Sequence, residues 1–123
     1  MQTSFNVDGV EKKKQIICLG AGFDTLFFHL QKKGMTPDLH IEIDFQSIVS
    51  EKIRLIKSSP LILDRLFPGK ETEEAISMIS TLSPSQNELH AGPYHLLSAD
   101  LRVIPDFVAA IDRCGFDKTF DPF

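Results

Sequence analysis

The sequence of 123 residues predicts an α/β fold built on a parallel sheet. Three short apolar segments are each followed by a segment whose apolar residues recur at helical spacing, and this alternation is typical of parallel strands joined by right-handed crossovers. Two glycines in residues 20–22 directly follow the first apolar segment, as in a tight turn between a strand and a helix. The second and third apolar segments lead into Asp44 and Asp100. We therefore expect three strand ends to meet at one edge of the sheet.

The first half of the chain supplies two strand–helix pairs. A run of apolar residues after a charged segment predicts a buried strand over residues 15–19, followed by a helix over 24–33. That helix is expected to end at Gly34, which tolerates a positive φ. The second strand is expected over 40–44, and its helix follows at once and stops before Pro60, which discourages a continuation.

The second half is less regular. We interpret residues 61–92 as an insertion between core elements, with a helix over 71–82 and a polar loop over 83–87. The third strand is expected over 94–98, and a helix follows that presents Ile104, Phe107, Val108 and Ile111 on one face. Residues 1–14 and 116–123 lack a pattern and are expected to form a disordered lead and a tail, so that one domain spans residues 15–115.

The composition of the chain limits the kinds of molecule that it is expected to bind. A net charge of -4 argues against nucleic acid, because phosphate contacts need clustered lysine and arginine. No apolar run approaches the roughly 20 residues of a membrane span, and the N-terminus lacks the features of a signal peptide, which favours a cytoplasmic location. The two cysteines and four histidines show no spacing typical of metal ligands or of a nucleophile triad. We therefore expect no metal site and no catalytic acid–base pair.

The expected strand ends carry the residues of a candidate ligand site. In parallel sheets, ligands bind outside the carboxyl ends of the strands. The glycine turn lets the backbone approach a ligand that a Cβ would keep away. Asp44 is placed to accept hydrogen bonds from the two hydroxyls of a ribose, while Asp100 can accept from an adenine amino group and Leu101 can pack against the ring. The candidate site comprises Gly20, Ala21, Gly22, Asp44, Asp100 and Leu101.

Each of these features also has a purely structural interpretation. Glycine turns are common after strands, and Asp44 or Asp100 could simply cap the helix that follows. Three such features at three consecutive strand ends favour a ligand site.

The neighbours of the glycine turn indicate the kind of ligand. Thr25 stands where a dinucleotide-binding fingerprint has its third glycine, and the carboxylate of Asp24 would repel a pyrophosphate. A flavodoxin-like or nicotinamide-binding half-domain is disfavoured for these reasons. A cationic adenosine derivative without phosphate fits better, and we expect S-adenosylmethionine.

Four blocks of the sequence resemble the leucine carboxyl methyltransferase family in their order and approximate spacing. They are LGAGFDTLFF at 19–28, IEIDF at 41–45, Ile48-Val49 with Lys52, and ADLR at 99–102. The resemblance implies the N-terminal half of a Rossmann-like class I methyltransferase sheet, with three parallel strands in the order 3-2-1. It implies S-adenosylmethionine as the cofactor, with Gly20 and Gly22 lining the methionine part, Asp44 at the ribose, and Asp100 and Leu101 at the adenine.

The resemblance also implies a partner. Residues 47–59 are closer to the branch that methylates the C-terminal leucine of type 2A protein phosphatase catalytic subunits. The branch that acts in wybutosine formation on transfer RNA is the near alternative.

The resemblance covers residues 15–115, which is only part of a family member. Helical segments upstream and a fourth strand downstream have no counterpart, so we expect a truncated form in which residues 16–19 are an exposed apolar edge and S-adenosylmethionine binds weakly or not at all. Two interpretations stay open. The chain is a methyltransferase, or it is a non-catalytic form that acts at most as a binding module.

Overall fold

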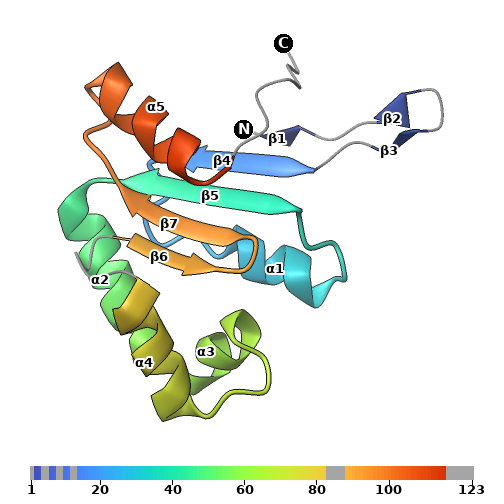
Figure 1. Cartoon of the computed structure of the whole chain (residues 1–123), viewed down its shortest axis with the longest axis vertical. Helices are drawn as coiled ribbons and strands as arrows, with labels where there is room; N and C mark the ends of the chain where they lie inside the picture. The colour runs from blue at the N-terminus through green and yellow to red at the C-terminus, as the bar shows by residue number, and fades with distance from the viewer. Residues whose placement is uncertain (1, 4–5, 8–9, 12–13, 83–87, 116–123) are drawn as a thin grey trace.

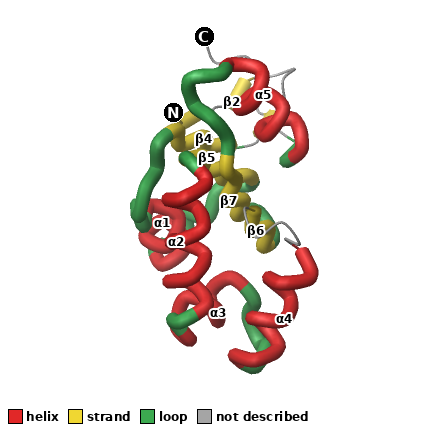
Figure 2. The backbone as a smooth tube through the Cα atoms, turned by 90° about the vertical axis from the view of Figure 1, so that its left-hand side faces the viewer, coloured by secondary structure: helices red, strands yellow, loops and turns green. Residues whose placement is uncertain are grey.

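The computed structural model describes residues 2–3, 6–7, 10–11, 14–82 and 88–115. In this part of the chain a five-stranded sheet runs through the molecule with helices on both faces (Figure 1). Helix α5 (Ile104–Arg113) covers one face, and helices α1 (Leu26–Lys32) and α2 (Gln46–Lys57) lie on the other. Helices α3 (Pro60–Leu66) and α4 (Thr72–Leu82) form the far end of the molecule beyond α2 (Figure 2). The predicted α/β class is confirmed.

The three predicted strands are parallel neighbours. Strand β5 (Leu39–Asp44) lies between β4 (Gln15–Leu19) and β7 (Tyr94–Ser98) and pairs in parallel with both. The carboxyl ends of these strands therefore meet at one edge, as the sequence predicted.

The sheet as a whole is nevertheless not the predicted sheet of three parallel strands in the order 3-2-1. It is mixed, in the order β1-β4-β5-β7-β6, because β6 (Glu88–Ala91) pairs antiparallel with β7 and β1 (Gln2–Thr3) pairs antiparallel with β4. Strand β6 forms a hairpin with β7 around Gly92, whose φ is +57°. The four residues of β6 alternate between polar and apolar, but so short a pattern after a polar loop is ambiguous, and the sequence analysis assigned it to an insertion.

The start of the chain contains short paired segments where the sequence showed no periodicity. Strand β2 (Asn6–Val7) pairs with β3 (Val10–Glu11), and β1 pairs with the first two residues of β4. The expected open edge over residues 16–19 is thus wrong at Ile16, which faces Gln2 across the ladder. Strands of only two residues are held together by backbone hydrogen bonds. They are too short to show an alternation of apolar and polar side chains in the sequence. The predicted tail lies outside the described residues, and the domain limits stay a prediction.

Helix α2 ends at Lys57, before Pro60 as predicted, and Pro60 then starts α3, a helix that the sequence analysis did not predict. Ser59 is the N-cap of α3, and its hydroxyl accepts a hydrogen bond from the backbone N–H of Ile62 at 3.4 Å. Proline is tolerated in the first turn because the N–H that it lacks has no partner there in any helix. No helix among the described residues has the length and apolar character that crossing a membrane requires.

Helix α5 packs through only part of the predicted face, together with one residue that was not predicted. Ile104 is 66% exposed and Val108 is 38% exposed, whereas Ala110 is buried. The helix contacts the sheet along Phe107, Ala110 and Ile111, which pack with Leu97 and the isoleucines of β4 and β5. A small alanine lets the helix approach the sheet closely, and counting only large apolar residues missed it.

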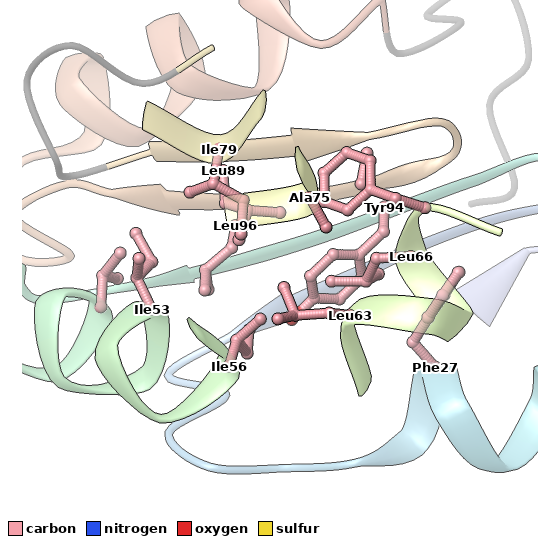
Figure 3. Close-up of a cluster of buried hydrophobic side chains, with 13 residues drawn as sticks. Phe27, Ile53, Ile56, Leu63, Leu66, Ala75, Ile79, Leu89, Tyr94 and Leu96 are labelled. Carbon is pink, nitrogen blue, oxygen red and sulfur yellow. The ribbon is translucent and has the colours of Figure 1, made fainter. Parts of the chain in front are cut away.

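The larger core lies on the opposite face of the sheet (Figure 3). Phe27 of α1 and Tyr94 of β7 form its centre, with ring centroids 4.8 Å apart. Residues of α2, α3, α4 and β6 surround them. Because helices cover both faces, all six residues of β5 are buried, including the polar His40, Glu42 and Asp44. These polar groups must therefore find partners within the protein.

Candidate functional site

The glycine turn leaves β4 in a conformation that requires glycine. Gly20 has φ +68° and Gly22 has φ +56°, both in the left-handed region that other residues rarely adopt. The N–H of Gly20 donates to the carbonyl of Ile43 at 2.8 Å, which fastens the turn to the end of β5. A Cβ on Gly20 would lie 3.9 Å from Cδ1 of Leu101, so the turn from β4 and the loop after β7 are in contact range.

Asp44 binds the glycine turn directly. Its Oδ2 accepts a hydrogen bond from the N–H of Gly22 at 2.8 Å, and its Oδ1 accepts from the N–H of Phe45 at 2.7 Å. The side chain does not cap α2, whose N-cap is Phe45, so the simple capping interpretation is wrong. Each carboxylate oxygen has a second lone pair. Asp44 can therefore orient the turn and still accept hydrogen bonds from a ligand.

Asp100 follows β7, and its carboxylate binds both the backbone and the guanidinium of Arg102. It accepts hydrogen bonds from the backbone N–H, Nε and Nη2 of Arg102 at 3.0, 2.9 and 3.1 Å. These bonds hold the pKa of Asp100 below its usual range. The guanidinium of Arg102 lies 5.6 Å from the centre of the Phe45 ring. Asp100 is not the N-cap of α5 either, since that position is Val103.

A cavity of about 210 Å³ opens between the ends of β5 and β7. Its lining residues are Phe45, Gln46, Ser98, Ala99 and Asp100. The N–H of Ala99 donates to the carbonyl of Asp44 at 3.0 Å, so the cavity adjoins the bonds just described. Pockets for whole small molecules measure about 300–1,000 Å³. This cavity is the size for part of such a ligand.

A buried network beneath the turn was not predicted. Glu42 is 1% exposed, and its Oε1 accepts hydrogen bonds from Nζ of Lys52 at 2.5 Å and from the hydroxyl of Tyr94 at 2.8 Å. Its Oε2 lies 3.0 Å from Nε2 of His40. Burial and the neighbouring Glu42 raise the pKa of Tyr94 well above its usual value, which keeps the phenol as a donor. The sequence does show polar residues at alternate positions of β5. Such residues usually face water, but here helices cover both faces of the strand.

The network reaches the turn through Lys52. Its Nζ also donates to the carbonyl of Asp24 at 2.8 Å, just beyond the glycine turn. The side chain of Asp24 accepts from the N–H of Leu26 at 3.0 Å and so begins α1. The hydrogen bonds that Gly22 and Ala99 donate to Asp44 thus join the three predicted strand ends. Lys52 links this edge to Glu42 at the centre of the sheet.

The chain is an α/β protein with a glycine turn and aspartates at the carboxyl edge of its parallel strands, the edge at which ligands bind in proteins of this class. A family model described as leucine carboxyl methyltransferase matches residues 4–121. The chain therefore belongs to the leucine carboxyl methyltransferase family, as its resemblance predicted.

Relatives of the chain occur in plants, animals and fungi. The chain is 32% identical over 123 residues to the leucine carboxyl methyltransferase 1 homolog of Arabidopsis thaliana, a match that covers 100% of this chain and 34% of that protein. It is 40% identical over 102 residues to leucine carboxyl methyltransferase 1 of Caenorhabditis elegans, covering 81% of this chain and 28% of the relative. For the Rattus norvegicus protein of the same name the identity is 31% over 107 residues, with 87% and 30% covered. The chain spans about a third of the length of these relatives.

Proposed function

We propose that this chain supplies the methyl-donor face of an S-adenosylmethionine-dependent leucine carboxyl methyltransferase. The observation that carries the proposal is the hydrogen bond between the N–H of Gly22 and the carboxylate of Asp44. It brings the backbone of the glycine turn and the acceptor for a ribose to the same point on the sheet edge. Family membership supports a methyltransferase over other nucleotide-binding proteins of this fold class.

The residues at this edge suit a cationic adenosine derivative. S-adenosylmethionine supplies a methyl group on a positively charged sulfonium. The turn would line its methionine part, Asp44 would accept from the ribose hydroxyls, and Asp100 with Leu101 would flank the adenine. The cavity beside Asp100 has room for part of such a ligand. The carboxylates of Asp24, Asp44 and Asp100 around the edge favour a cation over a pyrophosphate.

The proposed acceptor is the C-terminal leucine carboxylate of a type 2A protein phosphatase catalytic subunit. A terminal carboxyl group has a pKa of about 3.5 and is already an anion at neutral pH, so its methylation needs no general base. The protein has to orient the two reactants and exclude water from them. The relatives are named leucine carboxyl methyltransferase 1, which favours this branch over the one that acts on transfer RNA.

A second candidate function is a binding module without turnover. The cavity of about 210 Å³ makes up only one side of the proposed site and is too small to enclose a whole ligand. Because methyl transfer needs a site closed to water, this favours the second candidate. In that case the chain binds the methyl donor or a partner of the enzyme but does not transfer the group.

We expect S-adenosylhomocysteine to shift the backbone amide resonances of Gly20, Gly22 and Asp100 in a saturable way. The measurement is a two-dimensional amide NMR titration of the isotopically labelled chain, which detects weak as well as tight binding. NAD⁺ and ATP serve as controls because both carry adenosine joined to phosphates. Equal shifts with NAD⁺, or no shifts at these residues at saturating S-adenosylhomocysteine, would contradict the proposed site.

Methyl transfer is expected only to a peptide that ends in a free leucine carboxylate. The assay uses tritiated S-adenosylmethionine with a peptide of the phosphatase C-terminal tail, and the same peptide with an amidated C-terminus is the control. Turnover with the free peptide alone identifies an enzyme. Binding of S-adenosylhomocysteine without turnover identifies the binding module, and transfer to the amidated peptide rules out carboxyl methylation.

A further inference from the structure

We propose that His90, His95 and Cys114 form a zinc-binding site on the face of the sheet that α5 covers. This site was not expected from the sequence, because the spacing of these residues differs from that of known metal motifs. The fold brings them together from three elements: β6, β7 and the C-terminal end of α5. One donor atom from each side chain lies within 4.8 Å of the other two.

The two histidines are directly opposed in the β6–β7 hairpin. His90 pairs with His95 in the antiparallel register, and both side chains point to the face on which Leu97 and α5 lie, opposite to Leu89 and Leu96. Their Nδ1 atoms are 2.7 Å apart. Cys114, the C-cap of α5, is partly buried and packs beside Ile111 at the edge of the same core.

A carboxylate holds one of the rings in the orientation that a metal ligand needs. Nε2 of His90 lies 3.0 Å from Oε1 of Glu88, and Oε2 of Glu88 accepts a hydrogen bond from Nη2 of Arg113 at 3.0 Å. A carboxylate at Nε2 fixes the proton on that nitrogen and leaves the lone pair of Nδ1 directed at the cluster. Metal-ligating histidines almost always have such a partner on the other ring nitrogen.

A hydrogen bond between the two rings explains only part of this arrangement. One Nδ1–H can donate to the other Nδ1, which accounts for the distance of 2.7 Å. It does not account for the thiol of Cys114 at the same point, nor for the chain from His90 through Glu88 to Arg113.

A modest rearrangement of the three donor atoms, which lie within 4.8 Å of one another, would let them hold zinc. Around a tetrahedral zinc ion two imidazole nitrogens lie about 3.3 Å apart, and a nitrogen and a thiolate sulfur lie about 3.6 Å apart. The rings would have to separate by about half an ångström, and the thiol would move closer. Two imidazoles and one thiolate are a ligand set that zinc favours, and they leave the fourth position for water or another ligand.

Cobalt and zinc titrations of the untagged chain test the site. We expect one Co²⁺ per chain, with the absorption bands of tetrahedral cobalt and a thiolate-to-cobalt charge-transfer band, both removed by one equivalent of Zn²⁺. Cys114→Ser should abolish the charge-transfer band. Glu88→Gln should keep the band and lower zinc affinity by about 10–100-fold, because it removes only the partner that orients His90.

Cys18→Ser and His29→Ala are the matched controls, because they remove a cysteine of β4 and an exposed histidine of α1. Both should bind zinc like the unchanged chain. Circular dichroism checks that each variant folds, and if Cys114→Ser does not, the affinity of Glu88→Gln decides. No charge-transfer band in the unchanged chain, its loss in Cys18→Ser, or unaltered zinc affinity in Glu88→Gln would overturn the proposal.

Discussion

Replacing Glu42 by glutamine is expected to lower the free energy of unfolding by about 3–5 kcal/mol, because removing one partner of a buried ion pair leaves the other charge uncompensated. Glu42 is 1% exposed and Lys52 is 5% exposed, so the ammonium that remains has little access to water. Glutamine has nearly the same shape as glutamate, and the loss therefore reports on charge and not on packing. Urea denaturation followed by circular dichroism measures it.

Glu51→Gln is the matched control for this experiment. Glu51 pairs with Arg54 three residues further along α2, but both side chains are largely exposed, and the change should leave the urea midpoint almost where it was. Tyr94→Phe should fall between the two, since it removes one donor to Glu42 and keeps the lysine. A Glu42→Gln variant that unfolds at the same urea concentration as the unchanged chain would show that the network does not stabilise the fold.

Asp44→Ala is expected to lower the free energy of unfolding by about 2–4 kcal/mol, because two hydrogen bonds to a charged acceptor are lost. The donors are the N–H groups of Gly22 and Phe45, and Asp44 itself is 8% exposed. If the proposed function is correct, the amide shifts caused by S-adenosylhomocysteine at Gly20 and Gly22 should also disappear. Urea denaturation and the NMR titration measure the two effects separately.

Asp38→Ala provides the comparison for Asp44. The carboxylate of Asp38 also accepts a hydrogen bond from a distant backbone N–H, that of Lys14 at 2.8 Å, but it is exposed and lies at the other end of β5. Its removal should have a smaller effect on stability and none on the amide shifts. Full binding by a folded Asp44→Ala variant would remove Asp44 from the cofactor site while leaving its structural role intact.

Elements with a strong local pattern could be predicted from the sequence, and elements defined by pairing could not. The short apolar segments of β4 and β7 placed both strands at their correct residues. Strand β6 has only four residues, and their short alternation gains significance only because the segment pairs with β7. The end of α2 before Pro60 was predicted correctly, but the helix that Pro60 opens after the N-cap Ser59 was not.

The candidate site was predicted as a set of strand ends, and the structure brings those ends together. The sequence could not show that Asp44 binds Gly22, because the bond depends on how β4 and β5 are paired. Glu42 was missed because a polar residue at an alternate position normally faces water, and here both faces of the sheet are covered. The cluster of His90, His95 and Cys114 was missed for a related reason, since two of its members meet only across a hairpin.

Lys52 helps to hold the glycine turn in its conformation before any ligand binds at the carboxyl edge of the sheet. Its one ammonium group bonds both the carboxylate of Glu42 in the central strand and the carbonyl of Asp24, where the chain leaves the glycine turn. If the turn loosens, the buried ammonium of Lys52 loses one of its two acceptors, which costs more than the fraying of an ordinary surface loop. The edge is therefore already shaped before any ligand arrives. Binding there would give up little conformational entropy, which is the advantage of preorganisation.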